Sequence, residues 1–287
     1  MSIPILPLLL VVACSLGWAG FDLLRKLLVR EVPPEALLFL LTIGSAPLFA
    51  VWMLAAGTGG PGPGYWLPAL GSVLLNLVAN LLFLSGMRVA PLSVSVPLLS
   101  LTPVFATLLA IPILGEVPAP SDVFGILLVI AGAIWLHWQP REDSPRPGAL
   151  KGGVMVALTA LLWAMTIPLD KMAVERAPAQ FHGFVLTAGV AAGVLVVLLA
   201  RGGLGEVRRV RAVPGFLILA LVVSSLALGL QLLALPHIYV GTIETLKRGI
   251  GNFMALLSGW LFFGEAVTVR KVLAMLLMAV GVGLILT

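Results

Sequence analysis

Charged residues are scarce in this sequence. Asp, Glu, Lys and Arg make up 10% of the 287 residues, against about 25% in a typical soluble domain. Hydrophobic residues make up 60%, and the mean hydropathy is +1.15. This balance lies far outside the range of soluble globular domains, so we interpret the chain as a polytopic membrane protein embedded in the lipid bilayer.

Cysteine and histidine are also scarce. The single Cys14 cannot form an intrachain disulfide, and we expect a small apolar residue within a helix. His137, His182 and His237 lie far apart without the spacing of metal ligands, so we expect helix-interface or loop histidines, no metal site and no cofactor. The sequence lacks a clustered acid/base pair and a nucleophile motif, which argues against an enzyme.

Acidic residues are fewer than basic ones, which gives a net charge of +5 and a pI near 9.9. Lys and Arg collect in the cytoplasmic loops of membrane proteins, so this excess needs no nucleic-acid partner. The N-terminal segment MSIPILPLLLVVACSLGWAG lacks the basic start and the cleavage site of a signal peptide. We therefore expect it to form the first membrane helix.

Apolar runs of about 20 residues alternate with turn-rich breaks, which predicts ten membrane helices. The first five are Ile3–Leu24, Ala36–Ala56, Trp66–Met87, Pro91–Leu114 and Val123–Trp138. The second five are Gly152–Leu169, Phe181–Ala200, Val213–Leu235, Val240–Phe263 and Val267–Leu286. We expect a first five-helix repeat over residues 1–138, a linker over 139–149 and a second five-helix repeat over 150–287.

A weak internal repeat relates the two halves. A shift of 145 residues aligns LGWA (16–19) with LLWA (161–164) and Pro33 with Pro178, and a shift of 149 aligns LGE (114–116) with FGE (263–265). Because each half has five helices, the second enters the membrane from the opposite side, which predicts an all-α integral membrane protein built from inverted repeats. In such transporters the substrate site lies near the midplane, where the repeats meet.

Loop charges predict an orientation. The loops after the first, third, fifth, seventh and ninth helices hold thirteen Lys and Arg residues, Arg25 among them, whereas the opposite loops hold only Lys171 and Arg176. By the positive-inside rule the thirteen face the cytoplasm, which places both termini outside.

The predicted ninth helix, Val240–Phe263, carries Glu244, Lys247 and Arg248. At about 1.5 Å per residue, Lys247 lies roughly 11 Å into a hydrocarbon core about 30 Å thick. Lys or Arg at mid-helix costs roughly 2.5 to 3.5 kcal/mol, so such residues usually face a bundle interior or a water-filled cavity on a substrate or ion path.

Three interpretations of these charges stay open. In the first they are structural, because Glu244 can pair with Lys247 at i+3 and with Arg248 at i+4. In the second, which we favour, Lys247 and Arg248 face the central cavity and bind an anion, Arg248 through its planar fork and Lys247 as a compact charge. In the third, Glu244 takes up and releases a proton during transport.

The first half is neutral at the matching positions, since the repeat aligns Glu244 with Ser95 and the basic pair with Leu98 and Leu99. An asymmetric site of this kind suits an amphipathic ligand. The other candidate lining residues are Ser95, Thr102, Asn76, Asn80, Tyr239, Thr242, Asn252, Trp18 and Trp163. The two asparagines share one helix face, where their amides can also bond between helices.

The whole pattern resembles the EamA type of the drug/metabolite transporter superfamily. The resemblance rests on LTPVFATLLAIPILGE (101–116) followed by VFGILLVIAGAIWL (123–136), and on LLSGWLFFGE (256–265) followed by VRKVLAMLLMAVGVGLIL (269–286). It covers nearly the whole chain. It implies a ten-helix exporter or exchanger of amino acids, drugs, nucleotide sugars or sugar phosphates, with both termini in the cytoplasm, opposite to the loop-charge prediction.

The Lys247-Arg248 pair also resembles the lysine-arginine pair that plant triose-phosphate/phosphate translocators place in their ninth helix to hold phosphate. This resemblance implies an anion-binding role for these two residues. The other phosphate ligands of that family have no match in this sequence, and Glu244 makes the local charge less positive.

Together these observations predict a secondary active transporter of the bacterial inner membrane that carries small anionic or zwitterionic metabolites by alternating access. A monomer or a homodimer, and coupling to protons or to a counter-substrate, are both left open. A flippase for lipid-linked or amphipathic substrates is the alternative, and a membrane-embedded enzyme acting on lipid is a weaker one.

Overall fold

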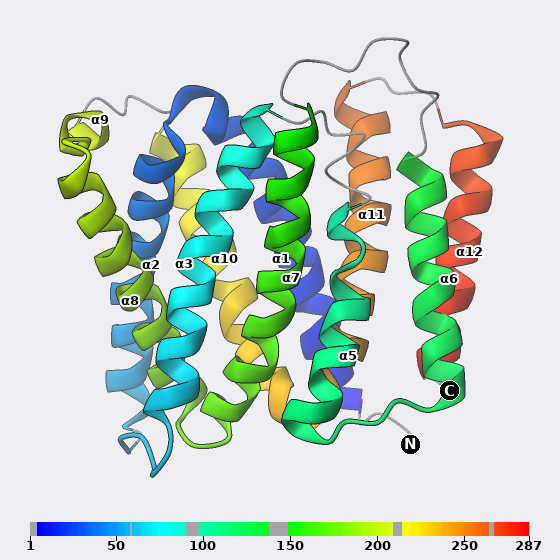
Figure 1. Ribbon diagram of the computed structural model, residues 1–287, viewed down its shortest axis with the longest axis horizontal. Coiled ribbons are helices and arrows are strands. Elements are labelled where there is room, and N and C mark those ends of the chain that lie inside the picture. The colour runs from blue at the N-terminus through cyan, green and yellow to red at the C-terminus, as the bar shows by residue number, and fades with distance from the viewer. Residues whose placement is uncertain are drawn as a thin grey trace.

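The protein is a bundle of roughly parallel and antiparallel helices (Figure 1). The computed structural model describes residues 5–57, 59–89, 98–137, 149–208, 214–263 and 267–286, and these ranges contain no strand. The helices are α1 (Ile5–Glu31), α2 (Pro34–Ala56), α3 (Trp66–Val89), α5 (Thr102–Leu114), α6 (Pro120–His137), α7 (Ala149–Val174), α8 (Ala179–Ala200), α9 (Leu204–Arg208), α10 (Pro214–Ala234), η1 (Leu235–His237), α11 (Val240–Phe263) and α12 (Val269–Leu286).

The helix lengths and compositions fit the ten predicted spans. In the described part of the chain, α1, α2, α3, α7, α8, α10 and α12 are long and apolar enough to cross a membrane, and α5 and α6 are shorter apolar helices. Helix α11 has 24 residues but carries the three charges noted above. The fold is therefore the predicted all-α membrane fold, with ten helices in two inverted five-helix repeats, and the short α9 is an addition to it.

Two predicted segments lie mostly outside the described residues. The predicted fourth helix, Pro91–Leu114, is described from Leu98 onward and contains α5, whereas residues 90–97, Ser95 among them, are not described. The predicted linker, 139–149, is described only at its last residue, Ala149, where α7 begins.

Two helix ends were predicted wrongly, and both errors concern charged residues. Helix α1 continues seven residues past Leu24, to Glu31, so Arg25 belongs to a helix and is 7% exposed. Helix α7 continues to Val174, so Lys171 lies inside it and is 8% exposed. An apolar run shows where a helix can cross lipid but not where its hydrogen bonding stops. Neither residue is a loop charge, so neither contributes to the orientation argument.

The repeat is visible in the backbone. Helices α2 and α8 begin after Pro33 and Pro178, which the repeat aligns, and their φ and ψ angles agree within a degree, at −56° and 143° and at −57° and 144°. Packing is most extensive between helices of different halves: α3 lies against α7, α6 against α12, α2 against α8, and α1 against α10. The halves therefore interleave, and the spaces between them run along the bundle.

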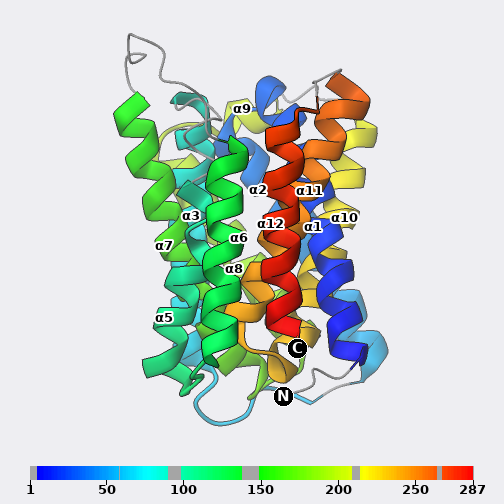
Figure 2. The same ribbon diagram turned by 90° about the vertical axis from the view of Figure 1, so that its right-hand side faces the viewer.

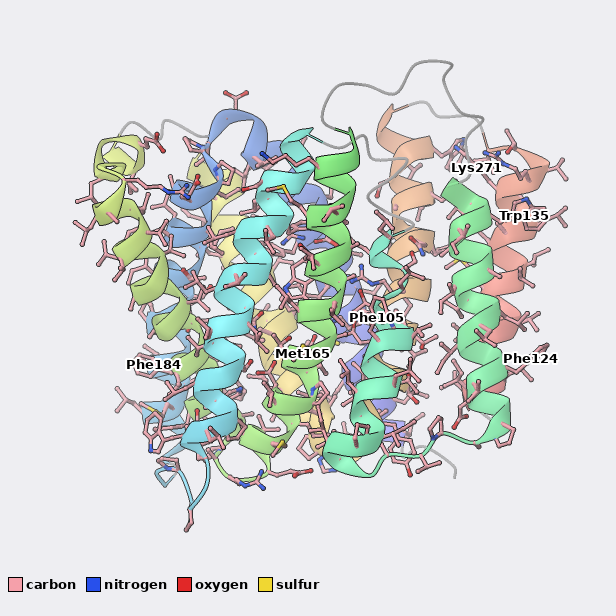
Figure 3. The ribbon with its side chains drawn as sticks, in the orientation of Figure 1. Phe105, Phe124, Trp135, Met165, Phe184 and Lys271 are labelled. Atoms are coloured by element: carbon pink, nitrogen blue, oxygen red, sulfur yellow. The ribbon has the colours of Figure 1, made fainter. Side chains whose placement is uncertain are left out.

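Both chain ends lie at one end of the bundle, which we call the lower end as drawn in Figures 1 and 2. At the opposite, upper end, α1 and α6 end and α7 begins. Apolar side chains cover the outside, and Phe124 and Trp135 project outward from α6 at 57% and 40% exposure (Figure 3). This surface suits contact with lipid.

Candidate functional site

A cavity of about 550 Å³ lies between the two halves and is lined by residues of α1, α2, α3, α7, α8, α10 and α11. Along α11 the lining runs from Glu244 to Ser258, a distance of about 21 Å at 1.5 Å per residue. The cavity also reaches Leu136, near the upper end of α6. It therefore extends from the lower middle of the bundle toward the upper end.

The cavity brings together eight of the twelve residues that the sequence suggested. These are Trp18, Asn76, Asn80, Trp163, Glu244, Lys247, Arg248 and Asn252. Thr102 does not line the cavity but accepts a hydrogen bond from Arg248. Tyr239 and Thr242 lie at a separate small pocket beside Glu116. Ser95 is outside the described residues.

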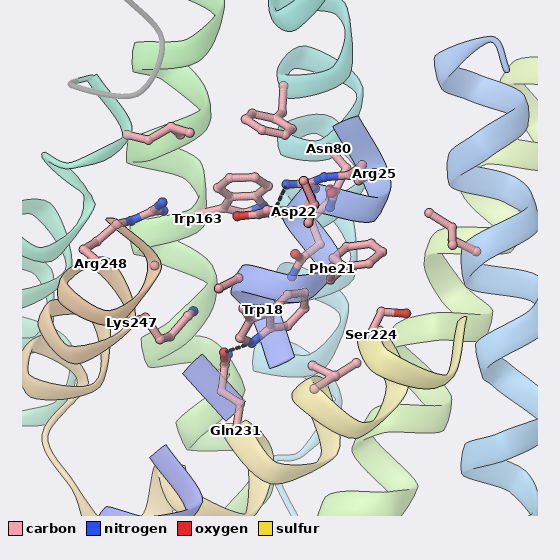
Figure 4. Close-up of a pocket in the computed structure, with 18 of the residues that line it drawn as sticks. Trp18, Phe21, Asp22, Arg25, Asn80, Trp163, Ser224, Gln231, Lys247 and Arg248 are labelled. Atoms are coloured by element: carbon pink, nitrogen blue, oxygen red, sulfur yellow. Dashed lines mark hydrogen bonds and ion pairs between the residues drawn. The ribbon is translucent and has the colours of Figure 1, made fainter. Parts of the chain in front are cut away.

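Glu244 neutralises only one of its two basic neighbours. Lys247 Nζ donates to Glu244 Oε1 at 2.5 Å, and the carboxylate is 1% exposed. The same ammonium lies 5.6 Å from the ring centre of Trp18, toward which Lys247 extends from α11 (Figure 4). Lys247 is thus satisfied by the chain itself, through an ion pair one helical turn away and an aromatic face.

Arg248 lacks a carboxylate partner among the described residues. Its Nη2 donates to Thr102 Oγ1 at 3.4 Å, a long contact, and its buried Nε has no hydrogen-bond partner in the described part of the chain. Asn252, one turn further along the same face, is 6% exposed, and its Nδ2 is likewise unpartnered there. Buried donors of this kind are costly unless something accepts their hydrogen bonds.

Sequence reasoning missed Arg25, which also lines the cavity. Its Nη2 donates to Asp22 Oδ1 at 2.6 Å, and its guanidinium lies 4.3 Å from the ring centre of Phe83 and 5.9 Å from that of Trp163. Figure 4 shows this group above Trp18, on the side of α1 that faces the cavity. The i, i+3 spacing of Asp22 and Arg25 at the end of an apolar run was the signal that could have revealed it.

Aromatic side chains form part of the cavity wall. The ring of Trp163 lies 5.0 Å from that of Phe83, and Trp18 Nε1 donates to Gln231 Oε1 of α10 at 2.9 Å. The repeat aligns Trp18 with Trp163, so each half contributes one tryptophan. The amide nitrogens of Asn76 and Asn80 bond to their own helix one turn earlier, at 3.2 and 2.8 Å, rather than across to another helix.

Asp170 was also missed. It lines the cavity at its lower end and is 2% exposed. The shift of 145 residues that relates the halves aligns Asp170 with Arg25, so the two repeats place opposite charges at equivalent positions. The contacts of Asp170 are with Ser72 and His182, which makes the latter a buried interface histidine.

The charges of the cavity balance. Its described lining includes three cationic residues, Arg25, Lys247 and Arg248, and three carboxylates, Asp22, Asp170 and Glu244. Two ion pairs, Arg25–Asp22 and Lys247–Glu244, account for four of the six. The remaining cation is Arg248, and the remaining carboxylate is Asp170.

The lower end of the bundle is closed by a second buried ion pair. Lys171 Nζ donates to Glu116 Oε1 at 2.6 Å and to the Ile238 carbonyl at 3.0 Å, and the Val240 backbone N–H donates to Glu116 Oε2 at 2.7 Å. Glu116 reaches this position because Gly115 ends α5 in the left-handed region, at φ 70°. The contact joins the first half to α7 and to the start of α11.

No group of three or more His, Cys, Asp or Glu that could hold a metal ion occurs among the described residues. The functional groups of the cavity are therefore hydrogen-bond donors, charges and aromatic faces. This inventory fits binding of a small polar molecule.

The chain matches the EamA-like transporter family twice, over residues 5–138 and 150–287. It is 29% identical over 132 residues to the uncharacterized transporter YvbV of Bacillus subtilis (strain 168), which covers 46% of this chain and 42% of YvbV. It is 26% identical over 143 residues to the uncharacterized transporter YwfM of the same organism, over 49% of this chain and 48% of YwfM. The chain thus spans less than half the length of either relative. One crystal structure shares the fold, with a TM-score of 0.78, 18% identity and 96% of both chains covered.

Proposed function

The chain belongs to the EamA-like transporter family, and from that premise we propose that it is a secondary transporter of small metabolites that carry a carboxylate, zwitterions foremost. The binding site is the cavity between the repeats, and Arg248 and Asn252 hold the carboxylate. Sited in the bacterial inner membrane, the protein moves its substrate by alternating access.

The observation that carries this proposal is the pair of unpartnered buried donors, Arg248 Nε and Asn252 Nδ2. Both line the cavity and share one face of α11. A carboxylate placed between them would accept from the guanidinium and from the amide, which supplies the missing acceptors. Glu244 does not compete for this role in the ligand-free protein, because it is engaged with Lys247.

The balance of charges supports a zwitterion over a simple anion. Measured from the lower ends of their helices, Asp170 lies four residues before the end of α7 and Arg248 eight residues after the start of α11, which corresponds to about 6 and 12 Å of helix. A substrate with a carboxylate on Arg248 and an ammonium near Asp170 leaves the cavity neutral. Trp18 and Trp163 offer aromatic surface to its apolar part.

Alternating access is supported by the difference between the two ends of the bundle. The cavity extends to the upper end, whereas the Lys171–Glu116 contact closes the lower one. The protein in this state exposes its site toward the side on which α1 ends. Transport then requires a second state in which the lower contacts open.

The test uses three compounds of nearly the same shape: leucine, its carboxylate counterpart 4-methylpentanoate, and its amine counterpart 3-methylbutylamine. Uptake of each is measured with the purified protein in liposomes. We expect leucine to be transported best and 3-methylbutylamine least. Arg248→Gln removes a charge-assisted hydrogen bond worth about 1.5 to 3 kcal/mol, so leucine transport at low concentration should fall at least about tenfold.

Arg201→Gln is the matched control, because Arg201 is exposed at the end of α8, outside the cavity, and pairs only with Glu35 among the described residues. It should leave transport unchanged. Undiminished leucine transport in Arg248→Gln contradicts the assignment of the carboxylate site. Transport of 3-methylbutylamine alone contradicts the proposed substrate class.

A further inference from the structure

A buried polar cluster lies at the lower end of the cavity, apart from the charges of α11. Asp170 Oδ1 accepts a hydrogen bond from the Ser72 hydroxyl of α3 and lies 3.0 Å from His182 Nε2 of α8. His182 Nδ1 lies 3.0 Å from the hydroxyl of Tyr65, which immediately precedes α3. His182 and Tyr65 have no exposed surface. One carboxylate and one imidazole thus meet where α3, α7 and α8 converge.

The contact with Tyr65 accommodates two protonation states of the imidazole. Burial raises the pKa of Tyr65, and the negative charge of Asp170 raises it further, so the phenol stays neutral. A neutral phenol donates its O–H to Nδ1 when His182 carries one proton and accepts the Nδ1–H when His182 carries two. His182 Nε2–H donates to Asp170 in both states. A proton can be added or removed without loss of a hydrogen bond.

Charged groups on the neighbouring segments are engaged elsewhere. On α7, Lys171 donates to Glu116, and Arg176, two residues beyond the helix, donates from Nη1 to the Met172 carbonyl. Beyond η1, the exposed His237 faces away from the buried cluster. Neither α5 nor α10 contains a charged residue.

The groups across the cavity are accounted for as well. On α11, Glu244 pairs with Lys247, and Arg248 contacts Thr102. On α3, the neighbours Ser72 and Asn76 are neutral. Among the described residues Asp170 forms an ion pair with His182 and with no Lys or Arg. A proton is therefore the one positive charge that the chain itself can place beside this carboxylate.

We propose that Asp170 and His182 bind the proton that drives transport, an inference that rests on the transport function proposed above. One proton enters the pair from water in the cavity and leaves to water on the other side after the bundle has switched. The unprotonated pair carries one negative charge and the protonated pair none, so nothing but the proton is exchanged. The ammonium group of a zwitterion neutralises the same carboxylate, so proton and substrate bind alternately, which is the requirement for exchange.

The position of the pair links it to the conformational change. Asp170 belongs to the second half and Ser72 to the first, and α3 packs against α7 more extensively than any other two helices pack. Asp170 also directly precedes Lys171, which closes the lower end. Loading of the carboxylate by a proton or by the substrate therefore acts on the contact between the halves that must open.

A first experiment observes the proton site without any substrate. The chain contains three histidines, so protein labelled with ¹⁵N-histidine gives few imidazole signals, and His182→Gln identifies the one that belongs to His182. We expect this signal to change with pH and the midpoint of its titration to move in Asp170→Asn. An invariant His182 signal, or the same midpoint in both proteins, overturns the proposal.

A second experiment measures coupling in liposomes. For one-to-one exchange, one pH unit across the membrane supports about a tenfold leucine gradient, because one unit is worth about 1.36 kcal/mol. We expect Asp170→Asn and His182→Gln to lose this accumulation while still letting leucine run down its own gradient. Glu206→Gln, an exposed change on α9, should retain both. Retained accumulation in Asp170→Asn, or its loss in Glu244→Gln alone, overturns the proposal.

The two proposals fail in different ways. Wild-type protein that moves leucine downhill but ignores the pH gradient overturns the proton site and leaves the transport function standing. Wild-type protein that moves none of the three compounds contradicts the proposed function, and the histidine titration then still decides whether the pair binds a proton. Unfolding midpoints of each variant separate a lost site from a lost fold.

Discussion

Two buried lysine-glutamate pairs of almost equal length occupy different places in this bundle. Lys247 and Glu244, 2.5 Å apart, belong to one helix and face the cavity. Lys171 and Glu116, 2.6 Å apart, belong to different halves of the chain and close the lower end. A pair within one helix moves with that helix, whereas a pair between halves must separate when the lower end opens. The first therefore sets the charge of the site and the second the stability of this state.

Removal of one partner from the pair between the halves should have the largest effect. Lys171→Met leaves the Glu116 carboxylate buried, with the Val240 N–H as its remaining partner. Stranding a buried charge costs about 3 to 5 kcal/mol. We expect a corresponding loss in the free energy of unfolding, measured by thermal or denaturant unfolding of purified protein in detergent. A change of a few tenths of a kcal/mol would mean that this pair does not hold the closed end.

The matched change in the pair within α11 should have a smaller effect on stability. Lys247→Met strands Glu244, but water in the adjacent cavity can solvate the carboxylate, so we expect a loss of about 1 to 3 kcal/mol. Its larger consequence is functional, because the lining gains a net negative charge and should repel the carboxylate of 4-methylpentanoate. Binding titrations and unfolding on the same sample measure both. Equal destabilisation by Lys171→Met and Lys247→Met would remove the distinction between the pairs.

The sequence was enough to predict the fold, because lipid imposes a length and a composition on every spanning helix. The ninth helix was located for the same reason, since Lys247 and Arg248 stand out against an apolar background. Residues whose partners are distant in sequence could not be placed in this way. His182 is twelve residues from Asp170 but on another helix, and its role depends on the turn that folds α8 against α7.

Helix ends were the other weak point of sequence reasoning. The apolar run stops at Leu24, but α1 continues because Arg25 is neutralised by Asp22 and stacks on Phe83, a contact that no local pattern reveals. Lys171 was assigned to a loop for the same reason, although Glu116 and a backbone carbonyl hold it inside. Charges that are satisfied by tertiary contacts look like loop residues in the sequence.

The smallest expected effect concerns a third ion pair, which provides the reference for the other two. Arg201 Nη1 lies 3.0 Å from Glu35 Oε1, and the two side chains are 71% and 21% exposed. Exposed pairs contribute about 0 to 1 kcal/mol, because water competes for both charges. We expect Arg201→Ala to change the free energy of unfolding by less than 1 kcal/mol, and added salt to reduce even that difference. A loss as large as that of Lys171→Met would show that helix contacts at the upper end, and not burial of the charge, govern the cost of breaking these pairs.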